Sequence, residues 1–131
     1  MTRSITPFLM YVGDAETAME FYASLFPGAQ TDITERFDDK GPGKPGSIKA
    51  ASLTLAGQKL MVFDSPVKHA FGFTPAISLF VECDSAAEVD GLFSKLSEGG
   101  QVMMPVDAYP FAKRFGWVQD KFGVSWQLRY A

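Results

Sequence analysis

The two halves of this chain of 131 residues contain the same order of predicted elements. In each half an apolar run is followed by a segment whose apolar residues recur every three or four positions, as on one face of a helix. An internal repeat of this kind restricts the possible folds more than any single motif does. The apolar runs are 5–12 and 76–81, and the helical segments carry Ala18, Phe21, Tyr22 and Leu25, and Val89, Leu92, Phe93 and Leu96.

The strand-like runs after each predicted helix also occur in matching order. A turn glycine starts the last run of each half, Gly57 in the first and Gly123 in the second. We therefore predict an α+β fold of tandem βαβββ modules, which form a cupped mixed sheet with the helices on its outer face. Module 1–65 and module 76–131 are expected to form one domain, joined by the linker 66–75. The runs are 29–37, 47–55 and 57–63, then 102–104, 115–119 and 123–129.

Both predicted helices have a recognisable start. Asp14 precedes the first helix, and an aspartate at that position can accept a hydrogen bond from the first free amides. Ser85 and Glu88 form the Ser-x-x-Glu pattern of a capping box at the second helix, which satisfies two backbone donors.

Two connections are predicted to lack regular structure. The segment 38–46 combines glycines, prolines and charges that cannot pack, so we expect a mobile surface hairpin. A lid over a pocket is the alternative interpretation of this loop. The segment 105–113 is expected to join two strands of the second module.

The composition argues against several partners and locations. The formal net charge is −3 and the Lys and Arg residues are scattered, which argues against nucleic acid binding. No run approaches the roughly 18 apolar residues of a membrane span, and no signal peptide pattern is present. We therefore expect a cytoplasmic protein that does not bind membranes. Cys83, the single cysteine, ends an apolar strand and is predicted to be a buried, unreactive thiol.

Alternation along the strands predicts which side chains face the concave side of the sheet. In the first strand, Phe8, Met10 and Val12 are predicted to pack under the first helix, and the residues between them are predicted to face the concave side. A slip of one residue would reverse the two faces of a strand. The predicted concave residues are Pro7, Leu9 and Tyr11; Ala76, Ser78 and Phe80; Lys59, Met61 and Phe63; and Ser125, Gln127 and Arg129.

Several segments give the chain a resemblance to a known superfamily. The tandem βαβββ order, Val12-Gly13-Asp14 with Phe21-Tyr22, and the ending 120–128 resemble the vicinal oxygen chelate superfamily. That superfamily includes glyoxalase I, bleomycin resistance proteins and extradiol dioxygenases. The run 115–127 is most similar to its PhnB-like branch, often labelled 3-demethylubiquinone-9 3-methyltransferase. The resemblance spans almost the whole chain and implies a dimer.

The resemblance also implies where a metal would bind. Metal-dependent members place a His, Glu or Gln near the start of the first strand and in the middle of the last strand of each module. The matching residues here are Pro7, Met61, Ala76 and Gln127. Pro and Ala have no side-chain donor and Met offers only a soft thioether, so we expect no metal and no other cofactor. A frame shifted by one residue gives Phe8, Val62, Ile77 and Trp126, which fit no better.

The favoured hypothesis is a metal-free protein that binds a small molecule in an apolar, aromatic cup, as a homodimer. Arg129 could pair with an anionic ligand.

The alternative is an enzyme of the same superfamily, of lyase, isomerase or dioxygenase type, with a non-standard metal or with His69, Tyr11 or Asp64 as acid–base groups. A pure interaction scaffold is a third possibility. Methyl transfer is not expected, because no glycine-rich nucleotide loop is present. The predicted ligand contacts are Leu9, Tyr11, Met61, Phe63, Ser78, Phe80, Gln127 and Arg129, with Phe115 or Trp117 as further candidates.

Overall fold

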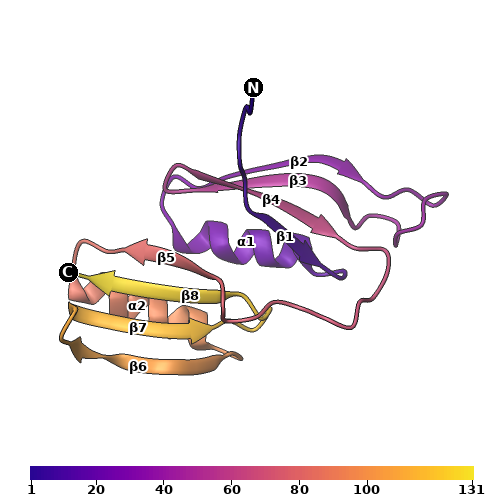
Figure 1. Cartoon of the computed structure of the whole chain (residues 1–131). Helices are drawn as coiled ribbons and strands as arrows, with labels where there is room; N and C mark the ends of the chain where they lie inside the picture. The colour runs from indigo at the N-terminus through magenta and orange to yellow at the C-terminus, as the bar shows by residue number, and fades with distance from the viewer. The chain divides into compact units, whose positions relative to one another are not determined.

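The computed structural model describes residues 1–131, which divide into two compact units, Met1–Ala70 and Phe71–Ala131. Each unit holds one helix and one four-stranded mixed sheet (Figure 1). The predicted α+β fold of tandem βαβββ modules is confirmed by this order. The first unit contains β1 (Phe8–Tyr11), α1 (Ala15–Leu25), β2 (Gln30–Arg36), β3 (Ile48–Leu55) and β4 (Gln58–Asp64). The second contains β5 (Ser78–Glu82), α2 (Ala86–Ser97), β6 (Gln101–Tyr109), β7 (Ala112–Gln119) and β8 (Ser125–Tyr130).

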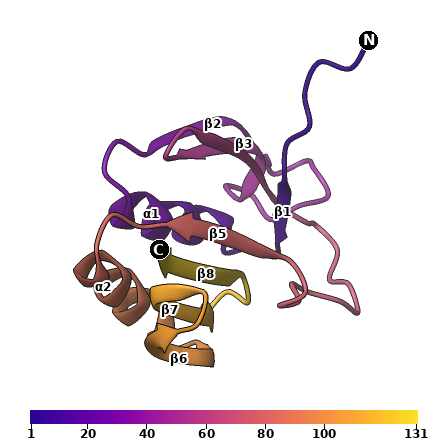
Figure 2. The same cartoon turned by 60° about the vertical axis from the view of Figure 1, so that its left-hand side comes forward.

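The strand order explains why each helix covers only one face of its sheet. The first sheet has the order β1-β4-β3-β2, with β1 parallel to β4 and the other neighbours antiparallel. The second sheet repeats this as β5-β8-β7-β6. Each helix connects the two edge strands of its own sheet, so it must cross one face (Figure 2). We call the opposite face of each sheet its open face.

The core of each unit lies between the helix and the sheet. Strands β3 and β4 bury alternate side chains, as expected for a sheet with one covered face. Strands β7 and β8 bury side chains on both faces, because Phe115 and Ser125 are buried in addition to the helix-side residues. The helices contribute the matching apolar stripes, since a short amphipathic helix is stable only when its apolar face is packed. The buried residues include Ala18, Met19, Tyr22, Leu53, Leu60 and Val62 in the first unit, and Val89, Leu92, Leu96, Val118, Trp126 and Leu128 in the second.

Two predicted loops differ from their expected form. Most of the segment 105–113 belongs to β6 and β7, which meet at a turn at Pro110 and Phe111. The segment 38–46 is irregular as expected, but the expectation that it cannot pack is wrong. Gly43 lies against the buried Phe37 ring so closely that a Cβ would be 2.5 Å from two ring carbons. Glycine is therefore required there because it has no side chain.

A distant aspartate, rather than the expected one, caps α1. Asp14 occupies the N-cap position but makes no side-chain capping hydrogen bond, so that prediction is wrong. The Asp64 carboxylate at the end of β4 instead accepts hydrogen bonds from the backbone amides of Gly13 (2.8 Å) and Ala15 (3.0 Å). Its other oxygen accepts from the amide of Ile48 at the start of β3 (2.9 Å). One buried carboxylate thus joins α1, β3 and β4.

The start of α2 follows the predicted capping pattern. The amide of Glu88 donates to Ser85 Oγ at 3.1 Å, as a capping serine requires. The Glu88 carboxylate accepts from the amide of Asp84 (2.7 Å), one residue before the cap. Both members of the Ser-x-x-Glu pattern therefore bind backbone donors at the helix start.

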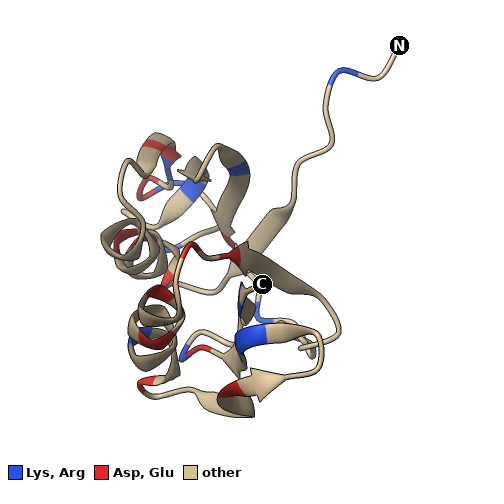
Figure 3. Cartoon of the chain, turned by 90° about the vertical axis from the view of Figure 1, so that its left-hand side faces the viewer, with Lys and Arg blue, Asp and Glu red and all other residues tan.

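The charged side chains and the helix lengths bear on possible partners. Figure 3 shows Lys and Arg interspersed with Asp and Glu in both units. Neither α1 nor α2 combines the length and the apolar character that crossing a membrane would require.

The Cys83 thiol lies in the second unit directly after β5 and is buried. Burial is the main reason that the pKa of this thiol is raised to about 11, with a smaller contribution from the Glu88 carboxylate. The thiolate is the reactive form of cysteine, so a raised pKa lowers reactivity at neutral pH. The structure thus agrees with the predicted buried, unreactive thiol.

The Asp64 cap leads to a stability prediction. Asp64→Ala leaves three backbone donors without their acceptor and should lower the free energy of unfolding by about 2–4 kcal/mol. The matched control Asp14→Ala removes a carboxylate that makes no capping bond and should cost at most about 1 kcal/mol through the helix dipole. Urea unfolding followed by circular dichroism measures both. Equal losses in the two variants would contradict the assigned role of Asp64.

The raised pKa leads to a prediction about thiol chemistry. In the folded protein at about pH 8, near the pKa of an ordinary thiol, Cys83 should react with an aromatic disulfide reagent far more slowly than in urea. The reaction should accelerate as the pH rises toward the Cys83 pKa, because the thiolate fraction increases. Absorbance of the released thiolate gives the rates. A native rate equal to the unfolded rate would show that the thiol is exposed.

Candidate functional site

The register of β1 corrects part of the predicted site. Leu9 pairs with Val62, and Tyr11 pairs with Asp64, both of which are buried. Paired residues on neighbouring strands point to the same face. Leu9 and Tyr11 therefore lie on the helix side, and the Tyr11 hydroxyl donates to Tyr22 Oη of α1 at 3.4 Å. Their predicted place on the concave side is wrong.

Phe8 lies on the open face, where Pro7, Leu9 and Tyr11 were expected instead. It pairs with Met61, and its ring centroid is 5.8 Å from that of Phe63. The side chains of β1 are apolar or aromatic on both faces, so alternation could not distinguish the two parities. Only the hydrogen-bonded register with β4 settles the direction.

The predicted parity of β4 is correct. Leu60 and Val62 are buried on the helix side, whereas Met61 is 42% exposed and Phe63 is half-buried. Met61 and Phe63 therefore lie on the open face, as does Lys59. Their contact with a ligand remains a prediction.

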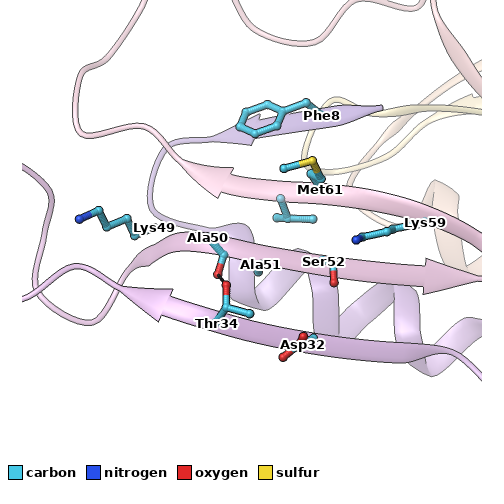
Figure 4. Close-up of a pocket in the computed structure, with 10 residues that line it drawn as sticks. Phe8, Asp32, Thr34, Lys49, Ala50, Ala51, Ser52, Lys59 and Met61 are labelled. Carbon is cyan, nitrogen blue, oxygen red and sulfur yellow. Dashed lines mark hydrogen bonds between the residues drawn. The ribbon is translucent and has the colours of Figure 1, made fainter. Parts of the chain in front are cut away.

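A hollow of about 210 Å³ lies on the open face of the first sheet. Figure 4 shows Phe8 and Met61 at one side of it and Thr34 and Asp32 at the other, with Ser52 between them. Thr34 Oγ1 donates to the carbonyl of Ala50 at 3.1 Å, which fixes this part of the wall. Sequence reasoning missed the β2 and β3 residues here, because no motif marks them. The hollow is lined by Phe8, Asp32, Thr34, Lys49, Ala50, Ala51, Ser52, Lys59, Met61 and Val62.

The open face of the second sheet contains most of the other predicted residues. Ser78 pairs with Ser125, and Phe80 pairs with Gln127. Leu79 and Val81 instead pair with Trp126 and Leu128, which are buried under α2. Ser78, Phe80, Gln127 and Arg129 therefore lie on the open face, as the alternation predicted. Ala76 precedes β5 and is not part of the strand.

A small hydrogen-bond network crosses this second open face. Ser78 Oγ and Ser125 Oγ are 2.6 Å apart, and Trp117 Nε1 donates to Ser125 Oγ at 2.8 Å. Gln127 Nε2 donates to Ser78 Oγ at 3.2 Å. Ser125 is buried, so its hydroxyl is needed to satisfy the indole of Trp117. Gln127 is thereby fixed with its amide nitrogen bound and its carbonyl oxygen available.

Aromatic rings form a cluster beside this network. Phe115 lies at the centre of the cluster. Its ring centroid is 6.5 Å from that of Phe80, 5.7 Å from that of Tyr109 and 5.0 Å from that of Phe111. The edge-on contacts with Tyr109 and Phe111 are favourable geometries for aromatic pairs. Sequence reasoning missed Tyr109 and Phe111 because it treated their segment as a loop; the Tyr-x-Phe spacing around Pro110 was the available signal.

Arg129 already has a partner of opposite charge. Its guanidinium group forms an ion pair with Glu82, the paired residue on β5, and lies 5.2 Å from the Phe80 ring centroid. The hydrogen bond from this guanidinium to Glu82 is the main reason that the pKa of Arg129 is raised. The carboxylate therefore competes with any anionic ligand for the cation.

The residues at the superfamily's metal positions do not fit a divalent ion. Pro7 and Ala76 have no side-chain donor, and the Pro7 carbonyl already accepts from the amide of Met61 (2.9 Å). Met61 offers a thioether, and Gln127 alone provides an oxygen suited to a hard cation. No group of three or more His, Cys, Asp and Glu side chains that could hold a metal occurs in residues 1–131.

The alternative acid–base residues are engaged in local structure. His69 Nε2 lies 3.2 Å from Ser65 Oγ, and Ser65 Oγ also donates to the carbonyl of Val67 at 2.7 Å. The Asp64 carboxylate accepts three backbone amides, none of them from the loop that carries His69. Tyr11 faces α1. The Asp64 carboxylate is therefore committed to backbone donors, and the Tyr11 side chain to the helix side of the sheet.

Comparisons with known proteins agree with the fold and the segments described above. The family model described as 3-demethylubiquinone-9 3-methyltransferase matches residues 3–129. The chain is similar to the PhnB protein of Bacillus cereus, with 50% identity, coverage of 98% of this chain and 100% of that one, and a TM-score of 0.94. It is also similar to protein PA1353 of Pseudomonas aeruginosa, with 30% identity, 98% coverage of each chain and a TM-score of 0.85.

A more distant likeness concerns the fold alone. The fosfomycin resistance protein FosX of Listeria monocytogenes is 15% identical, with coverage of 100% of this chain and 94% of that one and a TM-score of 0.69. The family model and the two nearer structures cover nearly the whole chain. The chain therefore belongs to the PhnB-like family described as 3-demethylubiquinone-9 3-methyltransferase, whose fold is that of the glyoxalase and fosfomycin resistance (vicinal oxygen chelate) superfamily.

Proposed function

We propose that this chain binds a small organic molecule on the open faces of its sheets and uses no metal ion to do so. The observation that carries this proposal is the hollow over Phe8 and Met61. Two large apolar side chains, 55% and 42% exposed, lie side by side on a sheet face that the helix does not cover. Apolar walls with a few polar groups are typical of small-molecule sites.

The position of Met61 supports the metal-free part of the proposal. In the metal-dependent members of this superfamily the middle of the last strand of a module carries a metal ligand, and here that position contributes a thioether to an apolar wall. Methionine adapts its shape and makes favourable contacts with aromatic rings. A residue that suits an organic ligand thus replaces one that suits a cation.

The second sheet offers groups that could orient a ligand. Gln127 presents its carbonyl oxygen, and the Ser78 hydroxyl can both donate and accept. Both residues lie next to the Phe80 ring, which provides a flat apolar surface. Ser78, Phe80 and Gln127 therefore remain proposed contacts on the second sheet, and Met61 and Phe63 remain proposed contacts on the first. Arg129 contributes mainly through its position over Phe80.

The family description does not lead us to propose methyl transfer. S-adenosylmethionine sites of the nucleotide-binding type follow a strand with a glycine-rich turn that opens a helix. The turns that open α1 and α2 here are Val12-Gly13-Asp14 and Cys83-Asp84-Ser85. The first contains one glycine and the second contains none. We infer that the description names the family and not the activity of this chain.

One observation favours an enzyme of the same superfamily as a second candidate. The hydrogen bond between Ser65 Oγ and His69 Nε2 places a hydroxyl next to a possible base. Ser65 is buried, however, and its oxygen also bonds both backbone groups of Val67. We therefore propose a structural role for this pair and rank catalysis second.

We also propose that the protein is a homodimer. Each sheet has edge strands, which proteins commonly cover by association or by other elements. Large apolar side chains are exposed on both open faces, including Phe8 and Phe80. A symmetric pair is the most frequent way for such surfaces to be covered in small soluble domains.

A thermal-shift screen tests ligand binding and the absence of a metal together. Dialysed protein should keep its Tm when Mn²⁺, Zn²⁺, Ni²⁺ or Mg²⁺ is added, because the four superfamily positions offer no fitting donor set. An organic ligand at about 100 times its Kd should raise the Tm by several degrees through preferential binding to the folded state. A rise with a divalent ion that a chelator reverses would contradict the metal-free proposal.

A matched pair of variants locates the site for any molecule that raises the Tm. Phe8→Ala removes a wall of the hollow and should reduce the ligand-induced shift. Val12→Ala changes a side chain that is equally exposed, at 55%, but lies outside the hollow, and it should leave the shift unchanged. If the ligand raises the Tm of Phe8→Ala as much as that of the parent protein, the open face of the first sheet is not the binding site.

Sedimentation velocity tests the proposed dimer. The expected particle has twice the chain mass of 14.3 kDa at micromolar concentration. Phe80→Glu places a charge on a proposed apolar contact surface and should shift the equilibrium toward the monomer. The exposed but peripheral change Lys68→Glu is the control. A single species of one chain mass over the whole concentration range would contradict the dimer.

A further inference from the structure

Four side chains form a row across the open face of the first sheet, and their polarity changes in steps. Asp32 on β2 pairs with Ser52 on β3, Ser52 pairs with Met61 on β4, and Met61 pairs with Phe8 on β1. Neighbouring strands lie about 4.8 Å apart, so the row spans about 14 Å. All four residues line the same hollow (Figure 4). The row runs from a carboxylate through a hydroxyl to a thioether and an aromatic ring.

The charges that line the hollow are not equally available to a ligand. Lys49 Nζ lies 3.0 Å from Glu35 Oε2, so its charge already has a partner. Asp32 and Lys59 form no ion pair in the structure. Figure 4 shows the Lys59 nitrogen directed along the sheet toward Ser52, whereas Lys49 points away from the centre. The hollow therefore presents one available anion and one available cation.

The spacing of these two groups limits what can satisfy both. Lys59 on β4 pairs with Thr54 on β3, whereas Asp32 on β2 pairs with Ser52 on β3. Thr54 and Ser52 are two residues apart and are therefore neighbours on the same face of the sheet. Asp32 and Lys59 are thus separated by two strand spacings across the sheet and by two residues along the strands, which places their Cα atoms about 12 Å apart. The long Lys59 side chain closes part of this distance. The remaining gap fits one small group that carries an ammonium and a carboxylate close together.

We propose that the hollow binds an α-amino acid, or a similar compact zwitterion, with an apolar side chain. The ammonium group pairs with Asp32, the carboxylate pairs with Lys59, and Ser52 lies between them as a hydrogen-bond partner. The apolar side chain lies on Met61 and Phe8. A purely cationic ligand would leave Lys59 unpaired, and a purely anionic one would leave Asp32 unpaired. The inference rests on the proposed small-molecule function and adds the class of ligand.

Three probes with one phenyl group test the charge requirement. L-phenylalanine carries both charges, 2-phenylethylamine lacks the carboxylate, and 3-phenylpropanoate lacks the ammonium. In ¹H–¹⁵N NMR titrations, L-phenylalanine should shift the amides around Ser52 and Met61. It should also bind about two- to fivefold more tightly than either of the other two, the size expected for one exposed ion pair. Equal affinity of all three probes would overturn the inference.

Two variants assign each charge to its partner. In Asp32→Asn, L-phenylalanine should bind no more tightly than 3-phenylpropanoate, and in Lys59→Met no more tightly than 2-phenylethylamine. Asp39→Asn and Lys68→Met make the same charge changes outside the hollow and should preserve the preference of the parent protein. Loss of the preference in these controls would show a general charge effect, which also overturns the inference.

A neutral probe separates this inference from the proposed function. If 2-phenylethanol shifts the same amides as strongly as L-phenylalanine, the zwitterion inference fails while the small-molecule site stands. If none of the four probes shifts any amide, the inference fails, and the thermal-shift screen still decides the proposed function independently.

Discussion

The first unit depends on one buried carboxylate that joins three segments distant in the sequence. Asp64 accepts the amides that open α1 and the amide that opens β3, from the last residue of β4. These bonds fix α1 over one face of the sheet, which in turn decides which alternate residues of each strand are buried. Because Leu60 and Val62 then pack beneath the helix, Met61 and Phe63 must face the other way. The open face is therefore a consequence of how the helix is held.

The second unit uses a related arrangement, since the buried Asp120 accepts two amides of the turn before β8 and the indole of Trp126.

Sequence patterns predicted the order of elements well because each element has its own local signal. Helical periodicity, turn glycines and the Ser85–Glu88 pattern all act within a few residues. The cap by Asp64 could not be predicted in the same way, because its donors lie about 50 residues earlier in the chain, and local spacing favoured Asp14. The parity of β1 failed for a similar reason: both of its faces carry large apolar or aromatic side chains, so only pairing with β4 reveals that Phe8, and not Tyr11, faces outward. The residues of β2 and β3 in the hollow have no motif at all and become visible only when the strands are aligned.

The two sheets have the same topology but present different chemistry on their open faces. On the first, a carboxylate, a hydroxyl, a thioether and a phenyl ring follow one another across the strands. On the second, a hydroxyl and amide network adjoins a cluster of aromatic rings, and the one arginine is paired with Glu82. The helix-side residues are alike in kind in both units, because both must fill the space under a helix. Divergence between the two modules is thus concentrated where side chains are not needed to hold the fold together.

The contact between Gly43 and Phe37 changes how the segment 38–46 should be regarded in protein engineering. Its composition is that of a spacer, and such segments are usual places for insertions, tags or grafted peptides. Here the spacer covers a buried aromatic ring, and that ring lies 6.3 Å from Phe63 between centroids. A graft that displaces Gly43 would expose Phe37 to water and loosen the support behind Phe63. Insertion sites in this chain are therefore better chosen before β1 than in the segment that looks most permissive.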